Sequence, residues 1–186
     1  MTKVLWKWFI NYEKEEAWLN EMSAKGLAFT DYFLCRYKFA DSAPDEYTVR
    51  IELLENVPVH PKSKQYLSFM AESGVELVST WFRWAYFRKK AEDGPFDIFS
   101  DIDSRIAHYK RITMLFFCLG FAEFCIGLGQ LIPAMHHLAS GTSLDGVSFN
   151  LILCCLIWCI GIVLIATGVS FKKKITKLRR DKELWN

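Results

Sequence analysis

Six tryptophan and arginine side chains in the N-terminal half of the chain have the chemistry to bind another molecule. They fall in three segments: Trp6, Trp8, Arg50, Trp81, Arg83 and Trp84. Tryptophan rings offer a broad apolar contact, and guanidinium groups bind carboxylates or stack on aromatic rings. This mixture favours an aromatic or anionic ligand, or an acidic partner surface. Packing in the core or in a homodimer interface is the alternative use of the same side chains.

Glu123 and Gln130 form a second candidate pair, because both lie in a long apolar segment. They are seven residues apart and therefore share one face of a helix. A charged carboxylate in lipid is costly, so Glu123 should face another helix or an oligomer partner, or be protonated. It could contact an ion, a proton or a ligand. The favoured interpretation is a hydrogen-bonded association site between helices.

Catalytic and metal-binding patterns are weak by comparison. Five of the six cysteines lie in apolar segments, and no CxxC pair or zinc-like Cys–His spacing occurs. His136 and His137 lack a third metal ligand. The sequence also contains no glycine-rich phosphate loop and no nucleophile elbow. We therefore expect no catalytic residue, no metal, no cofactor and no enzymatic activity.

The segments that carry the tryptophans alternate between strand and helix patterns. Strands are predicted at 4–10, 27–39, 47–54 and 75–89, and helices at 13–25 and 61–73. Asn11 is a candidate cap for the first helix, and Gly26 and Gly74 should end the two helices. The order β-α-β-β-α-β predicts an α+β domain over residues 1–95. Its expected fold is ferredoxin-like, with both helices on one face of an antiparallel sheet.

An internal similarity supports two related halves. Residues 16–27 and 65–75 both place an aromatic residue and leucine before methionine, then a glycine, then a strand. Because apolar side chains occur on both faces of the strands, one sheet face should carry an exposed aromatic binding surface. The basic, glycine-containing strand motif of RNA-binding sheets is absent from the sequence, so no nucleic acid is expected as a partner.

The second half of the chain is dominated by two apolar segments. Residues 112–135 and 149–171 each exceed the ~20 residues that a helix needs to cross the hydrocarbon core of a membrane. They predict a transmembrane hairpin with an extracytoplasmic turn at 136–148. A connector helix at 96–111, capped by Ser100 or Asp101, should join the hairpin to the domain.

Charge distribution predicts the orientation of this hairpin. Residues 112–171 contain no lysine or arginine, whereas Lys110 and Arg111 precede them and a basic tail follows at 172–186. The positive-inside rule then places both termini in the cytoplasm. The first residues also lack the apolar core of a signal peptide, so we expect the N-terminal domain to stay cytoplasmic.

The run from Tyr12 to Leu27, YEKEEAWLNEMSAKGL, is a distinctive motif, and shorter ones occur at residues 37–39, 47–50, 87–89 and 99–101. Together these segments resemble the bacterial family catalogued as domain of unknown function 2812. The resemblance implies a multi-pass protein of the bacterial cell membrane, often encoded beside PadR-like transcription regulators. It therefore implies a regulated membrane sensor or anti-regulator, and assigns no activity to individual residues.

Together these features predict a membrane-anchored, non-enzymatic sensory or regulatory protein that acts in signalling. Its cytoplasmic domain should bind a partner protein or a small amphipathic ligand through the aromatic and arginine-bearing sheet face. The expected partners are the lipid bilayer and either a second copy of the chain or another protein, with a PadR-like regulator suggested by family analogy. The alternative function is an accessory subunit of a membrane transporter or channel assembly organised through Glu123.

Overall fold

The chain is of the α+β class, as predicted. The structure is a computed structural model that describes residues 2–139 and 144–184. It divides into two compact units, with the boundary after Ser104. The first unit contains all the strands, and the second consists of two long helices.

The first unit contains one arrangement, strand–helix–strand–strand, twice in succession. The first copy comprises β1 (Thr2–Trp6), α1 (Tyr12–Ala24), β2 (Leu27–Phe33) and β3 (Arg36–Asp41). The second comprises β4 (Tyr47–Leu53), α2 (Pro61–Glu72), β5 (Glu76–Trp81) and β6 (Trp84–Lys90), followed by a short 3₁₀ turn, Ala91–Asp93. Each copy forms its own three-stranded antiparallel sheet, in the orders β1-β3-β2 and β4-β6-β5.

Backbone conformation shows how closely the two copies correspond. Gly26 and Gly74, 48 positions apart, end the two helices with φ of 76° and 77°. Leu34 and Phe82, separated by the same interval, occupy the hairpin turns with φ of 43° and 55°. The second strand of each copy also has a register shift at the equivalent place, between Phe29 and Asp31 in β2 and between Leu77 and Ser79 in β5. The internal similarity in the sequence thus reflects a βαββ unit.

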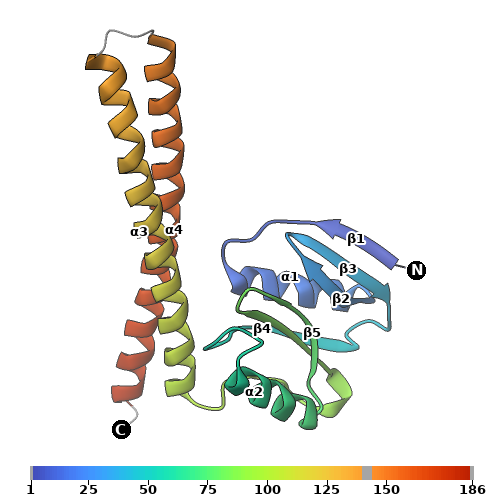
Figure 1. The fold of residues 1–186 in the computed structure, drawn as a ribbon. Coiled ribbons are helices and arrows are strands. Elements are labelled where there is room, and N and C mark those ends of the chain that lie inside the picture. The colour runs from blue at the N-terminus through green and yellow to red at the C-terminus, as the bar shows by residue number, and fades with distance from the viewer. Residues whose placement is uncertain (1, 140–143, 185–186) are drawn as a thin grey trace. The chain divides into compact units, whose positions relative to one another are not determined.

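The elements of this unit are layered as sheet, helix, sheet, helix (Figure 1). Trp18 of α1 packs edge-on against Tyr37 and Phe39 of the first sheet, with ring centroids 4.9 and 5.8 Å apart. The ring of Tyr12, also on α1, packs against the ring of Trp84 of the second sheet, with centroids 5.5 Å apart. On the far side of that sheet, α2 contributes Met70 to a buried cluster of apolar side chains: Leu54, Met70, Val75, Ala85, Phe87 and Phe96. Hence α1 lies between the sheets.

The ferredoxin-like prediction is wrong in its topology. The predicted strands 27–39 and 75–89 are each two strands, broken at Leu34–Cys35 and at Phe82–Arg83. These turns carry apolar residues in left-handed backbone conformations that glycine or asparagine usually adopt. The sequence therefore reads as one uninterrupted strand at both places. The pairing of segments 27–39 and 47–54 that a ferredoxin-like fold requires does not form either, because β4 pairs with β6.

The helix termini agree with the sequence. The Asn11 side chain accepts a hydrogen bond of 2.9 Å from the backbone N–H of Glu13 and caps α1. Asp101 caps the third helix, since its Oδ1 accepts a 2.7 Å hydrogen bond from the N–H of Ser104. This bond also keeps the pKa of the Asp101 carboxyl below its usual value. Local capping chemistry thus places these helix starts.

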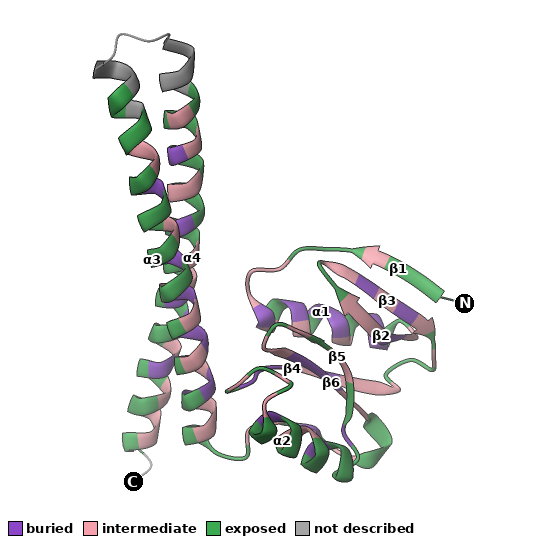
Figure 2. Ribbon diagram, in the orientation of Figure 1, coloured by how far each residue is buried: buried purple, intermediate pink, exposed green. Residues whose placement is uncertain are grey.

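The second unit contains α3 (Ile102–Ala139) and α4 (Leu144–Leu184). Both helices are long and apolar enough to cross a membrane. The predicted spans 112–135 and 149–171 lie inside them, and part of the predicted turn, residues 140–143, lies outside the described residues. Much of the surface of both helices is exposed (Figure 2). Phe121 and Ile162 are examples of exposed apolar side chains on these helices. A pair of helices in lipid has this distribution, whereas the core of a water-soluble protein does not.

Candidate binding surface

A buried carboxylate lies at the centre of the first unit. Oε1 of Glu15, on α1, accepts hydrogen bonds of 2.8 Å from the hydroxyl groups of both Tyr37 and Tyr86. Tyr37 belongs to β3 of the first copy and Tyr86 to β6 of the second, so one side chain joins both sheets. Burial raises the pKa of Glu15 above its ordinary value, although the two hydrogen bonds oppose the shift.

The tyrosines around Glu15 are held in their protonated form. Burial, followed by the nearby Glu15 carboxylate, raises the pKa of both Tyr37 and Tyr86. The ring of Tyr32 packs between them, with centroids 4.9 Å from Tyr37 and 4.7 Å from Tyr86. This closely packed cluster of donors and one acceptor holds the domain together.

Polar side chains of α1 cover the outer edge of β4. Asn20 accepts a 2.9 Å hydrogen bond from the N–H of Val49 and donates one of 3.0 Å to its carbonyl. Glu16 accepts from the N–H of Ile51 at 2.8 Å. One turn further along α1, Ser23 donates to the carbonyl of Tyr47 at 2.6 Å. These side chains take the place of a neighbouring strand and satisfy an edge that would otherwise be open.

The two sheets also meet at β2 and β5. Ser79 donates a 3.1 Å hydrogen bond to the carbonyl of Tyr32, and Arg88 donates one of 2.8 Å to the carbonyl of Phe29. The guanidinium of Arg88 also pairs with Glu76 at 2.7 Å. The connection between the sheets is therefore made largely by side chains.

Two of the predicted binding arginines are engaged within the domain. Arg83 donates hydrogen bonds of 2.6 to 3.0 Å to the carbonyls of Leu54 and Glu55, at the end of β4. Arg50 lies 3.4 Å from the carboxylate of Glu16. The guanidinium of Arg83 thus stabilises the end of β4, and that of Arg50 stabilises the contact of the second sheet with α1. Trp84 is half-buried against Tyr12.

The other predicted residues contribute to an exposed apolar surface, which we call the aromatic rim. Trp6 and Trp8 are 71% and 73% exposed, and Trp81 packs edge-on against Phe33 with centroids 5.2 Å apart. Phe33 and Trp6 both pair with Arg36 in neighbouring strands, so their side chains share one sheet face. The rim consists of these residues and the two turn residues: Trp6, Trp8, Phe33, Leu34, Trp81 and Phe82.

Sequence reasoning did not select three members of the rim as candidate binding residues. Phe33, Leu34 and Phe82 were assigned to the interior of long strands, whereas the structure exposes them at the ends of two hairpins. The signal that could have located them is the repeat itself. Extending the similarity between residues 16–27 and 65–75 forward aligns Leu34 with Phe82 and gives both halves the same number of strands.

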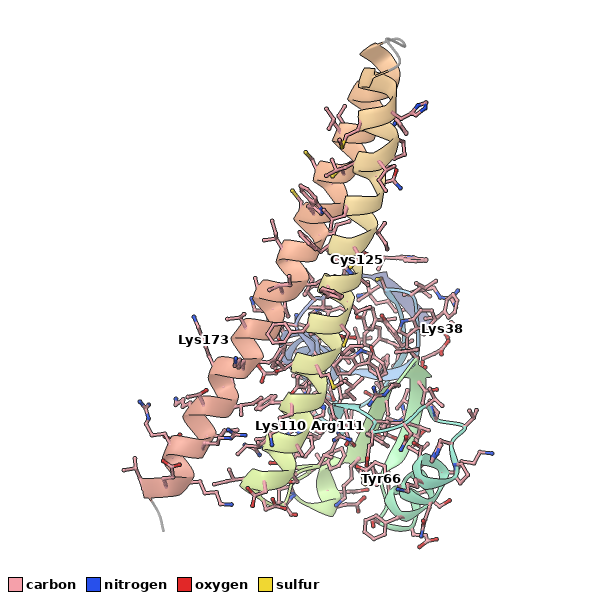
Figure 3. The ribbon with its side chains drawn as sticks, turned by 60° about the vertical axis from the view of Figure 1, so that its left-hand side comes forward. Lys38, Tyr66, Lys110, Arg111, Cys125 and Lys173 are labelled. Atoms are coloured by element: carbon pink, nitrogen blue, oxygen red, sulfur yellow. The ribbon has the colours of Figure 1, made fainter. Side chains whose placement is uncertain are left out.

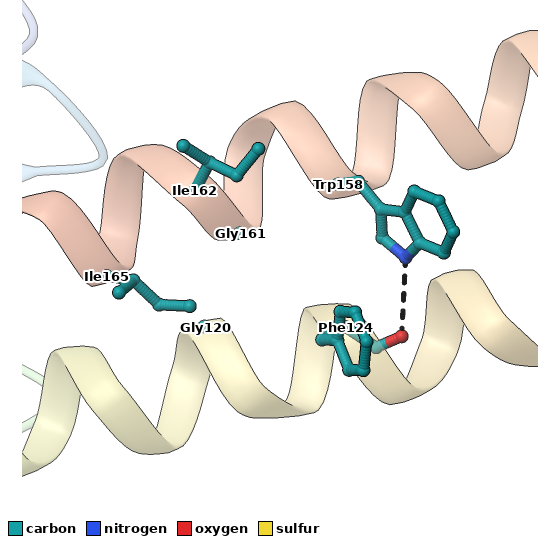
Figure 4. Close-up of a pocket in the computed structure, with 6 residues that line it drawn as sticks. All are labelled: Gly120, Phe124, Trp158, Gly161, Ile162 and Ile165. Atoms are coloured by element: carbon teal, nitrogen blue, oxygen red, sulfur yellow. Dashed lines mark hydrogen bonds between the residues drawn. The ribbon is translucent and has the colours of Figure 1, made fainter.

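Glu123 lies at the contact between α3 and α4. It is half-buried, and a Cβ atom added to Gly161 would lie 3.3 Å from its Cβ. Beside this contact, an apolar pocket of about 140 Å³ opens between the helices, and its lining includes Gly120, Phe124 and Gly161 (Figure 4). The indole N–H of Trp158, at the edge of this pocket, donates a 3.4 Å hydrogen bond to the carbonyl of Phe124. Gln130, two turns further along α3, is also half-buried.

The basic residues next to the apolar segments gather at one end of the helix pair. Figure 3 shows Lys110 and Arg111 on α3 and Lys173 on α4 towards the same end. The rings of Tyr109 and Phe171 pack in a tilted arrangement, with centroids 5.7 Å apart, and hold the helices together there. In the described part of the chain, no three His, Cys, Asp or Glu side chains converge to form a metal site.

These observations define a class of protein: an α+β domain made of two βαββ units, followed by two helices that could cross a membrane. The chain belongs to the family described as "Protein of unknown function (DUF2812)", whose model matches residues 11–121. The match begins before α1 and ends within α3, and it includes Glu15, Glu16, Asn20 and Ser23, the residues with which α1 joins the sheets. No curated protein and no solved structure matches the chain.

Proposed function

We propose that this protein is a membrane-anchored, non-enzymatic regulatory protein whose N-terminal domain binds a partner protein through the aromatic rim. The observation that carries the proposal is the exposure of Trp6 and Trp8 on an otherwise well-packed domain. Exposed apolar surface costs about 25 cal/mol per Å², and contiguous patches of it mark interaction sites. Tryptophan is also among the residues that contribute most to protein–protein binding energy.

The polar side chains of the domain support a binding role over a catalytic one. Glu15 is hydrogen-bonded to two tyrosines, and Arg83 and Arg88 are bonded to backbone carbonyls. Groups held in this way stabilise a fold, and acid–base chemistry needs groups that can reach a substrate. The rim, in contrast, presents apolar rings directly to solvent.

The helix pair supplies the anchor in this proposal. Lys110, Arg111 and Lys173 lie towards one end of the hairpin, and the apolar segments lie beyond them. The positive-inside rule places that end, and with it both termini, on the cytoplasmic side. A green fluorescent protein fused after Asn186 should therefore fluoresce. Alkaline phosphatase inserted at residues 140–143 should be active, and phosphatase activity at the C-terminus would contradict this orientation.

Site-specific photo-crosslinking in cells tests the binding role. A benzoylphenylalanine at position 8 of the full chain should form an adduct with one recurrent protein, because Trp8 lies in the rim. The same group at Phe69, an exposed aromatic position on α2 outside the rim, is the matched control and should form no such adduct. Identical adducts at both positions, or none at position 8, would refute partner binding through the rim.

A further inference from the structure

We propose that the outer face of the β1-β3-β2 sheet receives an acidic amphipathic helix of a partner protein, laid on it as α1 lies on the β4-β6-β5 sheet. This inference rests on the proposed function and names the class of partner. It follows from the two βαββ units. In the second unit this face is covered by α1, and in the first unit the equivalent face is the outermost layer of the domain (Figure 1).

Equivalent hydrogen bonds fix the correspondence between β1 and β4. The N–H of Lys7 donates to the carbonyl of Cys35 at 2.9 Å, and the N–H of Leu54 donates to the carbonyl of Arg83 at 2.8 Å. Counting back from these pairs aligns Val4 with Ile51. Ile51 is 1% exposed, whereas Val4 is 46% exposed. The same apolar position is thus buried in one unit and open in the other.

β1 is an edge strand like β4, and its outward N–H and C=O groups need hydrogen-bond partners of the kind that α1 supplies to β4. Hydrogen-bonded pairs alternate along antiparallel strands, so the bond at Lys7 directs the peptide groups of Val4 and Trp6 away from β3. In β4 the corresponding outward N–H of Ile51 is bound by Glu16. Among the described residues, none is hydrogen-bonded to the outward edge of β1. A helix with carboxylate and amide side chains would complete it.

Charge favours an acidic helix. The outer face of the first sheet carries Arg36 and Lys38, and one acid, Asp31, which is paired with Lys38 at 2.7 Å. The helix that covers the equivalent face, α1, contains four glutamates and one lysine in Tyr12–Ala24. The covering element of the second unit is therefore acidic, and the open face of the first is basic.

A second copy of the chain fits this face less well. The equivalent helix with a free outer side is α2, which carries Lys62 and Lys64 and no acid before Glu72. Placing α2 of another molecule on the first sheet would bring these lysines towards Arg36 and Lys38. Like charges in contact are unfavourable, so head-to-tail stacking of domains is disfavoured.

The test uses the covering helix as a probe. A fluorescein-labelled, hydrocarbon-stapled peptide with the sequence of residues 11–25, NYEKEEAWLNEMSAK, is titrated into the full chain in phosphatidylcholine nanodiscs. Fluorescence anisotropy should saturate. Trp6→Glu should weaken binding at least about tenfold, since a tryptophan anchor commonly contributes more than 1.4 kcal/mol. Phe69→Glu, the same change on the exposed side of α2, should leave binding within about twofold.

Each alternative occupant gives a distinct result. If the peptide binds the Trp6→Glu variant as tightly as the unmodified chain, it binds by displacing α1, and the proposal is overturned. A benzoylphenylalanine placed at position 4 tests the other occupants in anionic nanodiscs. If it labels lipid or a second copy of the chain in preference to the peptide, the proposal is also overturned. If the peptide does not bind while position 8 still crosslinks to a protein in cells, the helix partner is wrong and the binding role stands.

Discussion

The hydroxyl group of Tyr86 donates a 2.8 Å hydrogen bond to Oε1 of Glu15, and this contact ties a strand of the second βαββ unit to the helix of the first. Tyr37 shares the same oxygen from the first sheet. The two units therefore depend on each other, although each has its own sheet. A change at Glu15 should affect the whole domain because the bonds of both sheets converge there.

Stability of the domain should depend on pH through Glu15. Burial raises the pKa of Glu15 above its usual value of 4.5, and burial has the same effect on Glu16, against the opposing backbone hydrogen bond from Ile51 and the charge of Arg50. The folded state thus binds these protons more tightly than the unfolded state. This contribution is complete below pH 4.5 and is lost as pH rises through the higher folded values. Near-UV circular dichroism of the full chain in detergent should show an unfolding temperature that falls between pH 4.5 and 8.

The variant Glu15→Gln removes one of the two titrating groups and should flatten this pH dependence. Glutamine can still accept a hydrogen bond from a tyrosine hydroxyl, so the domain should fold. The exposed Glu21→Gln is the control and should leave the slope as it is in the unmodified chain. Equal slopes for Glu15→Gln and the unmodified chain would show that Glu15 does not titrate differently on folding.

Removing the edge cap should destabilise β4. Asn20→Ala deletes both hydrogen bonds to Val49 and leaves the buried N–H of Val49 without its partner, which should cost about 1–3 kcal/mol. Hydrogen exchange measured by mass spectrometry should increase in a peptide covering residues 47–53. Glu21→Ala, on the exposed side of the same helix, should leave that peptide unchanged. Unaltered exchange in Asn20→Ala would mean that α1 does not protect this edge.

A better turn sequence between β2 and β3 should stabilise the domain. Leu34 and Cys35 have φ of 43° and 65°, a pair of left-handed conformations suited to Asn-Gly. The double variant Leu34→Asn, Cys35→Gly should stabilise the domain by about 1 kcal/mol because it relieves this backbone strain. Chemical denaturation measures the gain. Val59→Asn, which makes a similar change at an exposed loop position, should give no gain. The double variant should also lose binding, since Leu34 belongs to the aromatic rim.

Close packing of α3 on α4 should depend on Gly120. A Cβ atom added there would lie 2.6 Å from Ile165 and 3.2 Å from the carbonyl of Gly161. Gly120→Val should therefore separate the helices and cost about 1–3 kcal/mol. Size-exclusion chromatography after heating in detergent should show less monodisperse protein. Gly129→Val is a matched control on the same helix, because no atom lies within 4 Å of the added Cβ. A loss of equal size in both variants would contradict the role of Gly120.

Glu123→Gln separates a packing role within the helix pair from a role in a transporter or channel assembly. Glutamine keeps the shape and a hydrogen-bonding end, so a side chain that only packs against Gly161 should tolerate the change. Light scattering of the purified variant should give the same oligomeric mass as the unmodified chain. A change in mass or a loss of ion flux in vesicles would instead support an accessory subunit of a transporter or channel.

Local chemistry made much of the architecture predictable. The cap at Asn11, the glycine ends at Gly26 and Gly74, and the cap at Asp101 are interactions between residues close in sequence. The two long apolar helices follow from length and composition, which are also sequence properties. The exposed tryptophans Trp6 and Trp8 were identified as candidate binding residues for the same reason, because their residue types alone indicate that role.

The strand pairing and the availability of the arginines were decided by the tertiary structure. Leu34 and Phe82 occupy turns without a turn-like sequence, and only the antiparallel pairing around them requires the reversal of the chain. Arg83 was predicted to bind a ligand or partner, yet the end of β4 places the carbonyls of Leu54 and Glu55 within its reach. Strand partners and hydrogen-bond acceptors come from residues distant along the chain, and a single sequence does not record those distances.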